Sequence, residues 1–99
     1  MNVKLERETG EIIQVFLDSR GVLHRILFDT PDDTRVIRYI DPYGDTVFNR
    51  LQIADLLADW ADLGSTDRSL EEVELLDAVA AMVRECAAEP GRYLRFVGD

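Results

Sequence analysis

One stretch of the chain, residues 39–45, gathers side chains that are able to do chemistry. It contains Tyr39, Asp41, Tyr43 and Asp45, with a proline and a glycine between them. Two carboxylates four residues apart can bind a hard cation or act as an acid-base pair when a loop brings them together. Aspartate, proline and glycine are also the residues that a strand-to-helix turn requires, and the calcium-loop pattern D-x-[DN]-x-[DN]-G is absent. We therefore interpret the stretch as a structural turn, with a ligand site as the alternative.

The only histidine, His24, is the second candidate for chemistry. Histidine is the commonest general base near neutral pH, and a serine nucleophile would need it at hydrogen-bond distance. The serines, however, lie at predicted turns and caps, and no G-x-S-x-G motif occurs. We therefore favour a histidine that is bonded to a tyrosine or to a backbone carbonyl over a catalytic base. The alternative small-ligand or active site therefore consists of five residues: His24, Tyr39, Asp41, Tyr43 and Asp45.

Acidic side chains recur along the predicted helices of the second half. Residues 51–99 contain eleven acidic and four basic residues, whereas residues 1–50 contain nine and seven. Like charges one turn apart destabilise a helix by about 0.2 to 0.5 kcal/mol per pair, so an unneutralised row of acids has a cost. We interpret the row as a solvated face, with a docking surface for a basic protein as the alternative on which our prediction of function relies. This acidic ridge consists of Asp55, Asp59, Asp62, Glu71 and Glu74.

Composition limits the partners and the location of the protein. A net charge of −9 repels phosphate backbones and anionic lipids, so we expect neither nucleic-acid nor membrane binding. No stretch reaches the roughly 20 apolar residues of a membrane span, and the first residues are too charged for a secretory signal, which predicts a cytoplasmic protein. Cys86 is the only cysteine and lies among apolar residues, which is typical of a buried side chain. No phosphate-binding glycine loop or cysteine metal cluster is present, so we expect no cofactor and no metal.

The first half of the chain is predicted to form strands. Apolar residues alternate with polar ones, or form short runs between turn residues, over residues 2–6, 12–18, 22–28 and 35–41. Asp29, Asp32 and Asp33 fall in the connection between the last two strands, which we interpret as a solvated loop. Because the connections are short, the four strands are predicted to form an antiparallel meander.

The second half is predicted to form two helices and a last strand. Asn49 with Gln52, and Ser69 with Glu72, have the spacing of capping boxes at the two helix starts. Gly64 is predicted to follow the end of the first helix, and Pro90-Gly91 to stop the second. The first helix carries an apolar stripe at i, i+3, i+4 and i+7, formed by Ile53, Leu56, Leu57 and Trp60. Residues 93–97 have the composition of a strand.

These elements predict an α+β fold. A four-stranded antiparallel meander is followed by a helical hairpin and a C-terminal strand, in one two-layer domain over residues 1–99. The C-terminal strand can pair antiparallel with the strand at 35–41 or parallel with the first strand. We favour the antiparallel choice, because antiparallel pairs are about two to three times as common as parallel pairs.

Two helices can cover only one face of a sheet of this width, so the other face is predicted to be bare. Apolar side chains on that face would mark an interface, and a symmetric homodimer is the commonest way to bury one. A register slip of one residue would instead send Val36 and Ile40 to the core. The predicted self-association face consists of Phe16, Leu23, Leu27, Val36 and Ile40.

Charge and fold together predict a small acidic protein without catalytic activity that binds another, basic protein. Its action would rest on surface complementarity, in the manner of an inhibitor, an immunity protein or an antitoxin. The alternative is a small-ligand-binding domain or an enzyme that uses His24 and the stretch 39–45.

Overall fold

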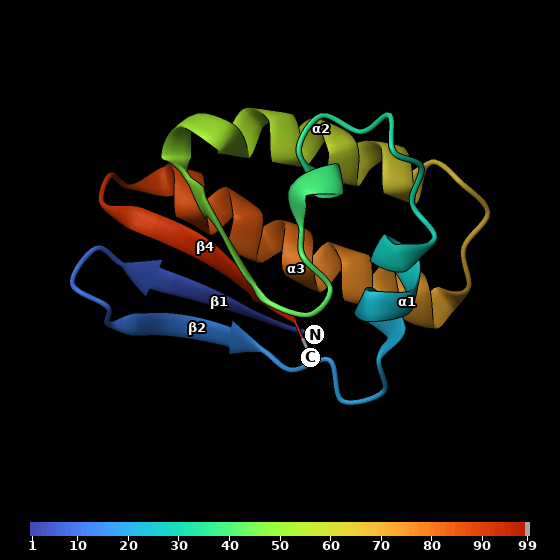
Figure 1. The fold of residues 1–99 in the computed structure, drawn as a ribbon, viewed down its shortest axis with the longest axis horizontal. Helices are drawn as coiled ribbons and strands as arrows, with labels where there is room; N and C mark the ends of the chain where they lie inside the picture. The colour runs from blue at the N-terminus through green and yellow to red at the C-terminus, as the bar shows by residue number, and fades with distance from the viewer. Residues whose placement is uncertain (99) are drawn as a thin grey trace.

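A computed structural model describes residues 1–98 as a sheet packed against helices (Figure 1). The strands are β1 (Asn2–Arg7), β2 (Ile12–Phe16), β3 (Asp45–Asn49) and β4 (Arg92–Val97), and the α-helices are α1 (Val22–Phe28), α2 (Ile53–Gly64) and α3 (Leu70–Ala88). Two short 3-10 helices are η1 (Ile37–Tyr39) and η2 (Arg50–Gln52). Asp99 lies outside the described residues.

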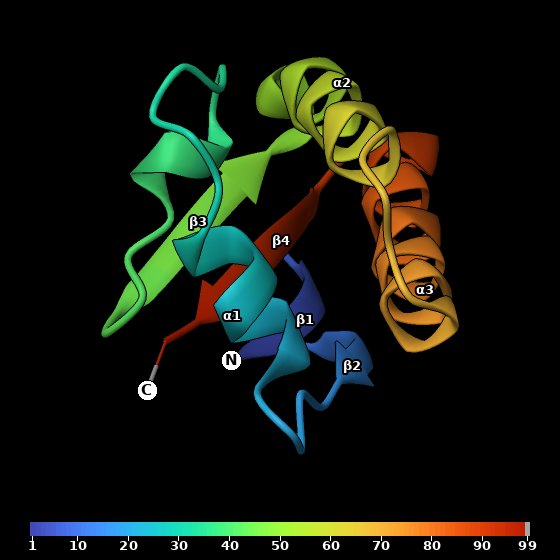
Figure 2. The same ribbon diagram turned by 90° about the vertical axis from the view of Figure 1, so that its right-hand side faces the viewer.

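The sheet has the order β2-β1-β4-β3, and every pair of neighbouring strands is antiparallel. The helices α2 and α3 form a hairpin on one side of it, and α1 lies beyond the strand ends (Figures 1 and 2). The predicted fold class, an α+β fold with an antiparallel sheet, a helical hairpin and a C-terminal strand, is confirmed.

The C-terminal strand β4 lies in the middle of the sheet. It pairs with β1, where Leu94 is opposite Leu5, and with β3, where Leu94 is opposite Phe48. The predicted pairing with residues 35–41 is wrong, because those residues do not form a strand. Residues 46–48, for which the sequence indicated only a short extended piece, lie inside β3 and occupy the edge position instead.

The predicted strand at 22–28 is also wrong, since these residues form α1. Val22, Leu23 and Ile26 are buried at positions i, i+1 and i+4, which is helical spacing. The carboxylate of Asp18 accepts the backbone N–H groups of Leu23 at 3.1 Å and His24 at 3.0 Å. Donors at the start of a helix have no partner within the helix, so this carboxylate favours the helix over a hairpin.

The predicted strand at 35–41 is replaced by an irregular segment that contains η1. The backbone N–H groups of Val36 and Ile37 donate to the carboxylate of Asp59, at 2.8 and 3.1 Å. These donors are therefore occupied by a side chain of α2 and are not free to join a sheet.

The core lies between the sheet and the helices. Trp60 is only 4% exposed, packs on Phe96 at a centroid distance of 6.1 Å and donates its indole N–H to the carbonyl of Leu76 at 3.0 Å. The predicted role of Trp60 in the core is confirmed. The fully enclosed side chains of the sheet are Val3, Leu5, Phe48, Leu94 and Phe96.

The helix boundaries follow the predicted caps at three of four ends. Both capping boxes are present, at Asn49 before η2 and at Ser69 before α3. The helix α3 ends at Ala88, just before Pro90-Gly91. Gly64 was predicted to follow the first helix, but it is the last residue of α2, and Ser65 forms the cap.

Candidate functional site

The five residues of the alternative ligand site do not form one cluster. His24 and Tyr43 lie on the two sides of Phe28, with ring centroid distances of 5.0 Å from His24 to Phe28 and 6.2 Å from Phe28 to Tyr43. Tyr39 lies apart from this group, is 62% exposed and accepts a hydrogen bond from Arg38 at 3.0 Å. Of the three ring-bearing residues, only His24 and Tyr43 are therefore near one another, and the ring of Phe28 separates them.

The two aspartates of the stretch 39–45 have separate partners. Asp41 accepts the backbone N–H of Tyr43 at 2.9 Å, which forms a turn, and its own N–H donates to Thr46 at 2.9 Å. Asp45 forms an ion pair with Arg95 of β4 at 3.1 Å. These contacts agree with our interpretation of the stretch as a structural turn. They account for both carboxylates without a ligand.

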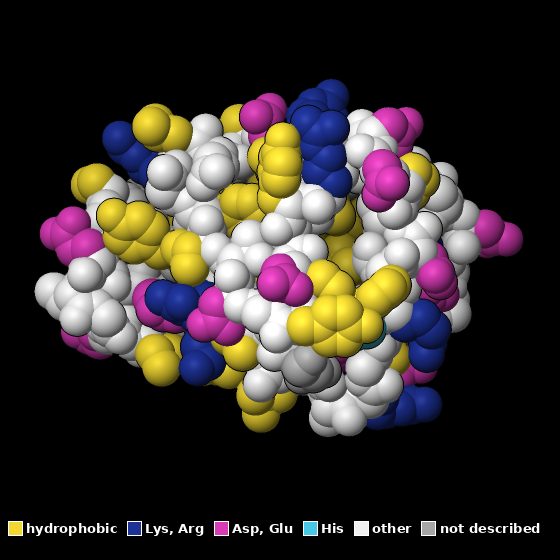
Figure 3. Space-filling view, in the orientation of Figure 1, with side chains coloured by type: hydrophobic (Ala, Val, Ile, Leu, Met, Phe, Trp, Pro, Cys, Tyr) yellow, Lys and Arg dark blue, Asp and Glu magenta, His cyan; other side chains and the backbone are white. Residues whose placement is uncertain are grey.

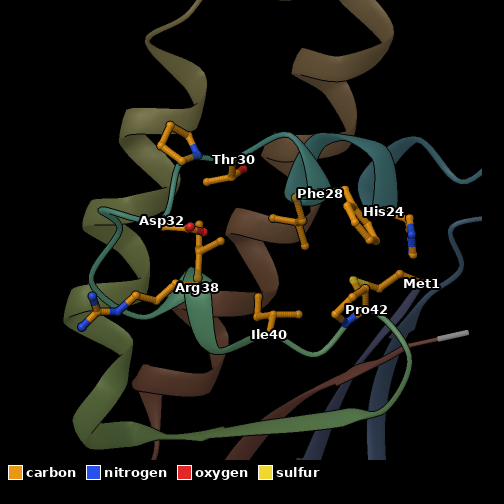
Figure 4. A pocket seen from close by; sticks show the side chains of 11 residues that line it. Met1, His24, Phe28, Thr30, Asp32, Arg38, Ile40 and Pro42 are labelled. Carbon is orange, nitrogen blue, oxygen red and sulfur yellow. The ribbon is translucent and has the colours of Figure 1, made fainter.

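A small cavity of about 150 Å³ lies between α1 and the segment around η1 (Figure 4). His24 and Phe28 contribute to one side of it, and Ile40 and Pro42 to the other. The Nδ1 atom of His24 is buried and has no hydrogen-bond partner among the described residues. Figure 3 shows only a small part of the histidine at the surface. The cavity therefore lies beside a buried ring nitrogen that has no partner among the described residues, and its lining is mixed, with Thr30, Asp32 and Arg38 among apolar side chains.

The predicted self-association face does not exist as one surface. Leu23 and Val36 are buried in the core, and Leu27, Ile40 and Phe16 are partly buried against it. The prediction was wrong because it placed four of these residues on strands that are in fact α1 and the η1 segment. Exposed apolar side chains gather instead along β2.

Of the five residues of the acidic ridge, Asp59 does not face solvent. It is 2% exposed, and its carboxylate accepts the N–H groups of Arg35, Val36 and Ile37. Its placement in a docking surface was therefore wrong. Asp59 is next to Trp60 at the border of the apolar stripe, where the segment before η1 covers it.

The other four acids of the ridge are exposed but not equivalent. Asp62 is 3.6 Å from the guanidinium of Arg35, and Glu71 is 2.7 Å from that of Arg20. Asp55 and Glu74 form no ion pair within residues 1–98. They lie near the starts of α2 and α3, which Figure 1 shows at opposite ends of the hairpin. The four residues therefore do not make a continuous acidic strip.

A groove of about 770 Å³, larger than the cavity beside His24, lies between residues 29–35 and the C-terminal part of α2. We call it the acidic groove. Its two basic side chains are already engaged: Arg35 with Asp59 and Asp62, and Arg68 with the carbonyl of Leu63 and with Glu72. The lining residues are Asp29, Thr30, Pro31, Asp33, Thr34, Arg35, Asp59, Asp62, Leu63, Thr66 and Arg68.

Asp29 and Asp33 are the free acids of this groove. Both are exposed, and neither forms an ion pair in the described part of the chain. The sequence interpretation assigned them to a solvated loop and missed the groove. The three aspartates within residues 29–33 were the sequence feature that could have indicated a charged site. The concave surface itself arises only because this loop packs beside α2.

Asp59 also lines the acidic groove, and its carboxylate is ionised. Burial would raise the pKa of Asp59, but the hydrogen bonds from the backbone N–H groups of Val36, Arg35 and Ile37, with the Arg35 side chain, outweigh it. The pKa of Asp59 therefore lies below its ordinary value. Because its lone pairs are taken up by these donors, Asp59 holds the loop in place rather than offering a charge to a partner.

Three further observations concern what the protein resembles and binds. Within residues 1–98, no three histidine, cysteine, aspartate or glutamate side chains come together in a way that could hold a metal ion. None of the described helices combines the length and the apolar character needed to cross a membrane. Comparisons of the chain with protein-family models, with curated proteins and with solved structures found no match.

Proposed function

We propose that this is a binding protein without catalytic activity, and that its acidic groove receives a basic segment of another protein. One observation carries the proposal. Asp29 and Asp33 are exposed and unpaired at a concave surface whose own guanidinium groups are already bonded. An arginine or lysine side chain from a partner would supply the missing positive charge.

The charge of the whole chain supports a basic partner. A net charge of −9 on 99 residues creates a negative field that attracts cationic surfaces and speeds their encounter. Asp62 also lines the groove, and its contact with Arg35 is long, at 3.6 Å. The arriving cation would therefore meet up to three carboxylates on one surface.

Concavity favours the groove over the acidic ridge that the sequence predicted. Asp55 and Glu74 lie near opposite ends of the helical hairpin, so one small basic segment would not meet both (Figure 1). In the groove, by contrast, the loop at 29–35 and α2 place Asp29, Asp33 and Asp62 around the same hollow. A groove also removes more water from a bound side chain, which strengthens a charge contact.

The test uses a fluorescent octa-arginine peptide as a defined basic probe, with binding followed by anisotropy. Asp29→Asn/Asp33→Asn removes the two free charges of the groove, and Asp55→Asn/Asp77→Asn removes two exposed, unpaired charges on the helices. An exposed ion pair contributes about 0.2 to 1 kcal/mol, so we expect the groove variant to bind about three- to tenfold more weakly. The helix variant should bind nearly as well as the parent.

The parent should also lose affinity as salt rises, because the screening length falls from about 10 Å at 0.1 M to about 3 Å at 1 M. Salt dependence with equal weakening in both double variants would mean that the peptide senses only overall charge. That result would reject the groove as the docking site. Circular dichroism and urea unfolding of each variant check that the fold is retained.

A second candidate function, the binding of a small molecule beside His24, has one specific observation in its favour. The buried Nδ1 atom of His24 has no hydrogen-bond partner within residues 1–98, and a buried polar atom without a partner costs about 1 to 3 kcal/mol. A ligand with a hydroxyl group could satisfy it. The cavity of about 150 Å³ is smaller than most ligand pockets, so the ligand would have few heavy atoms.

Phenol and toluene form a matched pair of probes for this candidate, since they differ in one hydroxyl group. The imidazole signals of His24 are followed by NMR during each titration. Saturable shifts with phenol and much weaker ones with toluene would support a polar ligand site. No shift with either probe would remove this candidate.

A further inference from the structure

The strand β2 is an uncharged edge of the sheet on a strongly charged protein. It pairs only with β1 among the described strands, so the backbone groups of its other side have no strand partner. Its sequence, Ile-Ile-Gln-Val-Phe, contains no charged residue and no proline. Charged residues and proline are two of the features by which natural proteins protect an edge strand from pairing with another chain, and β2 has neither.

Exposed apolar side chains are concentrated at this edge. Ile12 is 51% exposed, Ile13 37%, Val15 41% and Leu17 66%, and they are four of the eleven large apolar residues that face solvent. Figure 3 shows hydrophobic atoms along the lower margin of the molecule, where β2 runs in Figure 1. Val15 and Leu17 are spaced by two residues, so in an extended chain they share one face, although Leu17 follows the last residue of β2. Ile13 lies at a β-bulge, because the pairing with β1 shifts between Leu5 and Glu6 and gives Ile13 no partner on that strand.

The other edge strand, β3, carries a charged residue and is partly covered by the segment that precedes it. It carries Asp45 at its start, in an ion pair with Arg95. The segment before it also turns back onto it, where the Asp41 N–H donates to Thr46 at 2.9 Å. The two edges are therefore not equivalent, and β2 is the one left open.

We propose that a second copy of this chain pairs antiparallel with β2, edge to edge, to form an eight-stranded sheet across a two-fold axis. Two copies with a net charge of −9 each repel one another, so they can approach closely only where charge is absent. An axis through Val15 places this residue beside its counterpart and Ile13 beside Leu17 of the second copy. Apolar side chains then meet apolar side chains, and no acidic residue of one copy faces an acidic residue of the other within the pairing.

This pairing is independent of the acidic groove and of its function. A ladder of about five residues buries less surface than the roughly 1,600 Å² of a standard interface, so the dimer should be weak and visible at micromolar concentrations. Sedimentation velocity over roughly 10 to 300 μM should show a species that approaches twice the 11.3 kDa mass of the chain.

The test compares Val15→Glu with Val47→Glu. The two valines are 41% and 42% exposed, lie on the two edge strands and are each opposite a basic residue of the neighbouring strand, Lys4 and Arg95. Each new carboxylate therefore has a cation beside it within the folded chain. In the proposed dimer, the carboxylates introduced by Val15→Glu would face each other across the axis.

We expect Val15→Glu to raise the dimer dissociation constant about tenfold or more and Val47→Glu to leave it within about twofold, because only the first opposes like charges. Leu17→Glu is a second variant, just after the end of β2. It should also weaken the dimer, because it places a charge beside Ile13 of the second copy. A parent that stays monomeric at 300 μM, or equal weakening by Val15→Glu and Val47→Glu, would overturn the proposal. Circular dichroism shows that each variant is folded.

Discussion

The carboxylate of Asp59 accepts the backbone N–H of Val36 at 2.8 Å, across 23 residues of sequence. The same oxygen accepts the N–H of Ile37, and the other accepts that of Arg35. One side chain of α2 thereby holds the segment that precedes η1. This contact explains why residues 35–37 leave the sheet and why the acidic groove has a wall beside α2.

The first prediction concerns the stability that Asp59 supplies. Asp59→Asn replaces one accepting oxygen by an amide that cannot accept a hydrogen bond, and it removes the charge. Hydrogen bonds to a charged group contribute about 1.5 to 3 kcal/mol each, so we expect the free energy of unfolding to fall by an amount in that range. Urea unfolding at pH 7 measures the change.

The pH dependence of this loss follows from the lowered pKa of Asp59. A carboxylate whose pKa is lower in the folded state stabilises the fold above its unfolded pKa of about 3.9 and loses that effect as pH falls through the folded pKa. The gap between the parent and Asp59→Asn should therefore be full at pH 7 and should shrink below about pH 4. Asp62→Asn, at an exposed site, is the control and should change little. A gap that stays constant between pH 7 and pH 3 would contradict the role of the charge.

The second prediction separates the packing of Trp60 from its hydrogen bond. Trp60→Ala removes a buried ring that packs on Phe96, and such changes cost about 3 to 5 kcal/mol. Trp60→Phe keeps a ring but removes the donor to the Leu76 carbonyl, for which we expect a loss of about 1 kcal/mol beyond the change in ring size. Thermal and urea unfolding measure both. If Trp60→Ala melted within a degree or two of the parent, α2 would not be anchored as described.

The third prediction tests the start of α1. Asp18→Ala removes the acceptor of the Leu23 and His24 N–H groups, so the first turn of α1 loses its two side-chain hydrogen bonds. Asp18 also accepts the buried N-terminal ammonium of Met1 at 3.3 Å, so we expect the free energy of unfolding to fall by more than the about 0.5 to 2 kcal/mol of a lost helix cap. The amide protons of Leu23 and His24 should also exchange faster with solvent, as followed by NMR. Ser19→Ala, at the neighbouring exposed position, should leave the exchange unchanged. If the amide protons of Leu23 and His24 exchanged equally fast in the parent and in Asp18→Ala, the Asp18 carboxylate would not stabilise the start of α1.

The fourth prediction concerns the reactivity of the only cysteine. Cys86 is buried, and burial raises the pKa of its thiol, an effect that the nearby Arg92 only partly offsets. Because the thiolate is the reactive form, the folded protein should react slowly with a disulfide reagent at pH 8. In urea the rate should rise to that of a free thiol. A fast reaction in the folded state would show that the core around α3 opens readily.

The sequence alone determined much of the second half of the chain. The capping pairs Asn49 with Gln52 and Ser69 with Glu72 lie where the sequence placed them, and Trp60 lies in the core as its apolar stripe predicted. These features depend on residues three to seven apart in one helix. Local spacing therefore contains the information that decides them.

Tertiary structure alone decided the middle of the chain and with it the candidate sites. Residues 22–28 are a short apolar run that suits a strand or a helix, and the Asp18 carboxylate favours the helix. Residues 35–37 give their N–H groups to Asp59 rather than to a neighbouring strand. Neither contact has a periodic signature, because each joins one side chain to backbone groups elsewhere. The groove at Asp29 and Asp33 and the open edge at β2 both result from those contacts, which arise only when distant parts of the chain pack together.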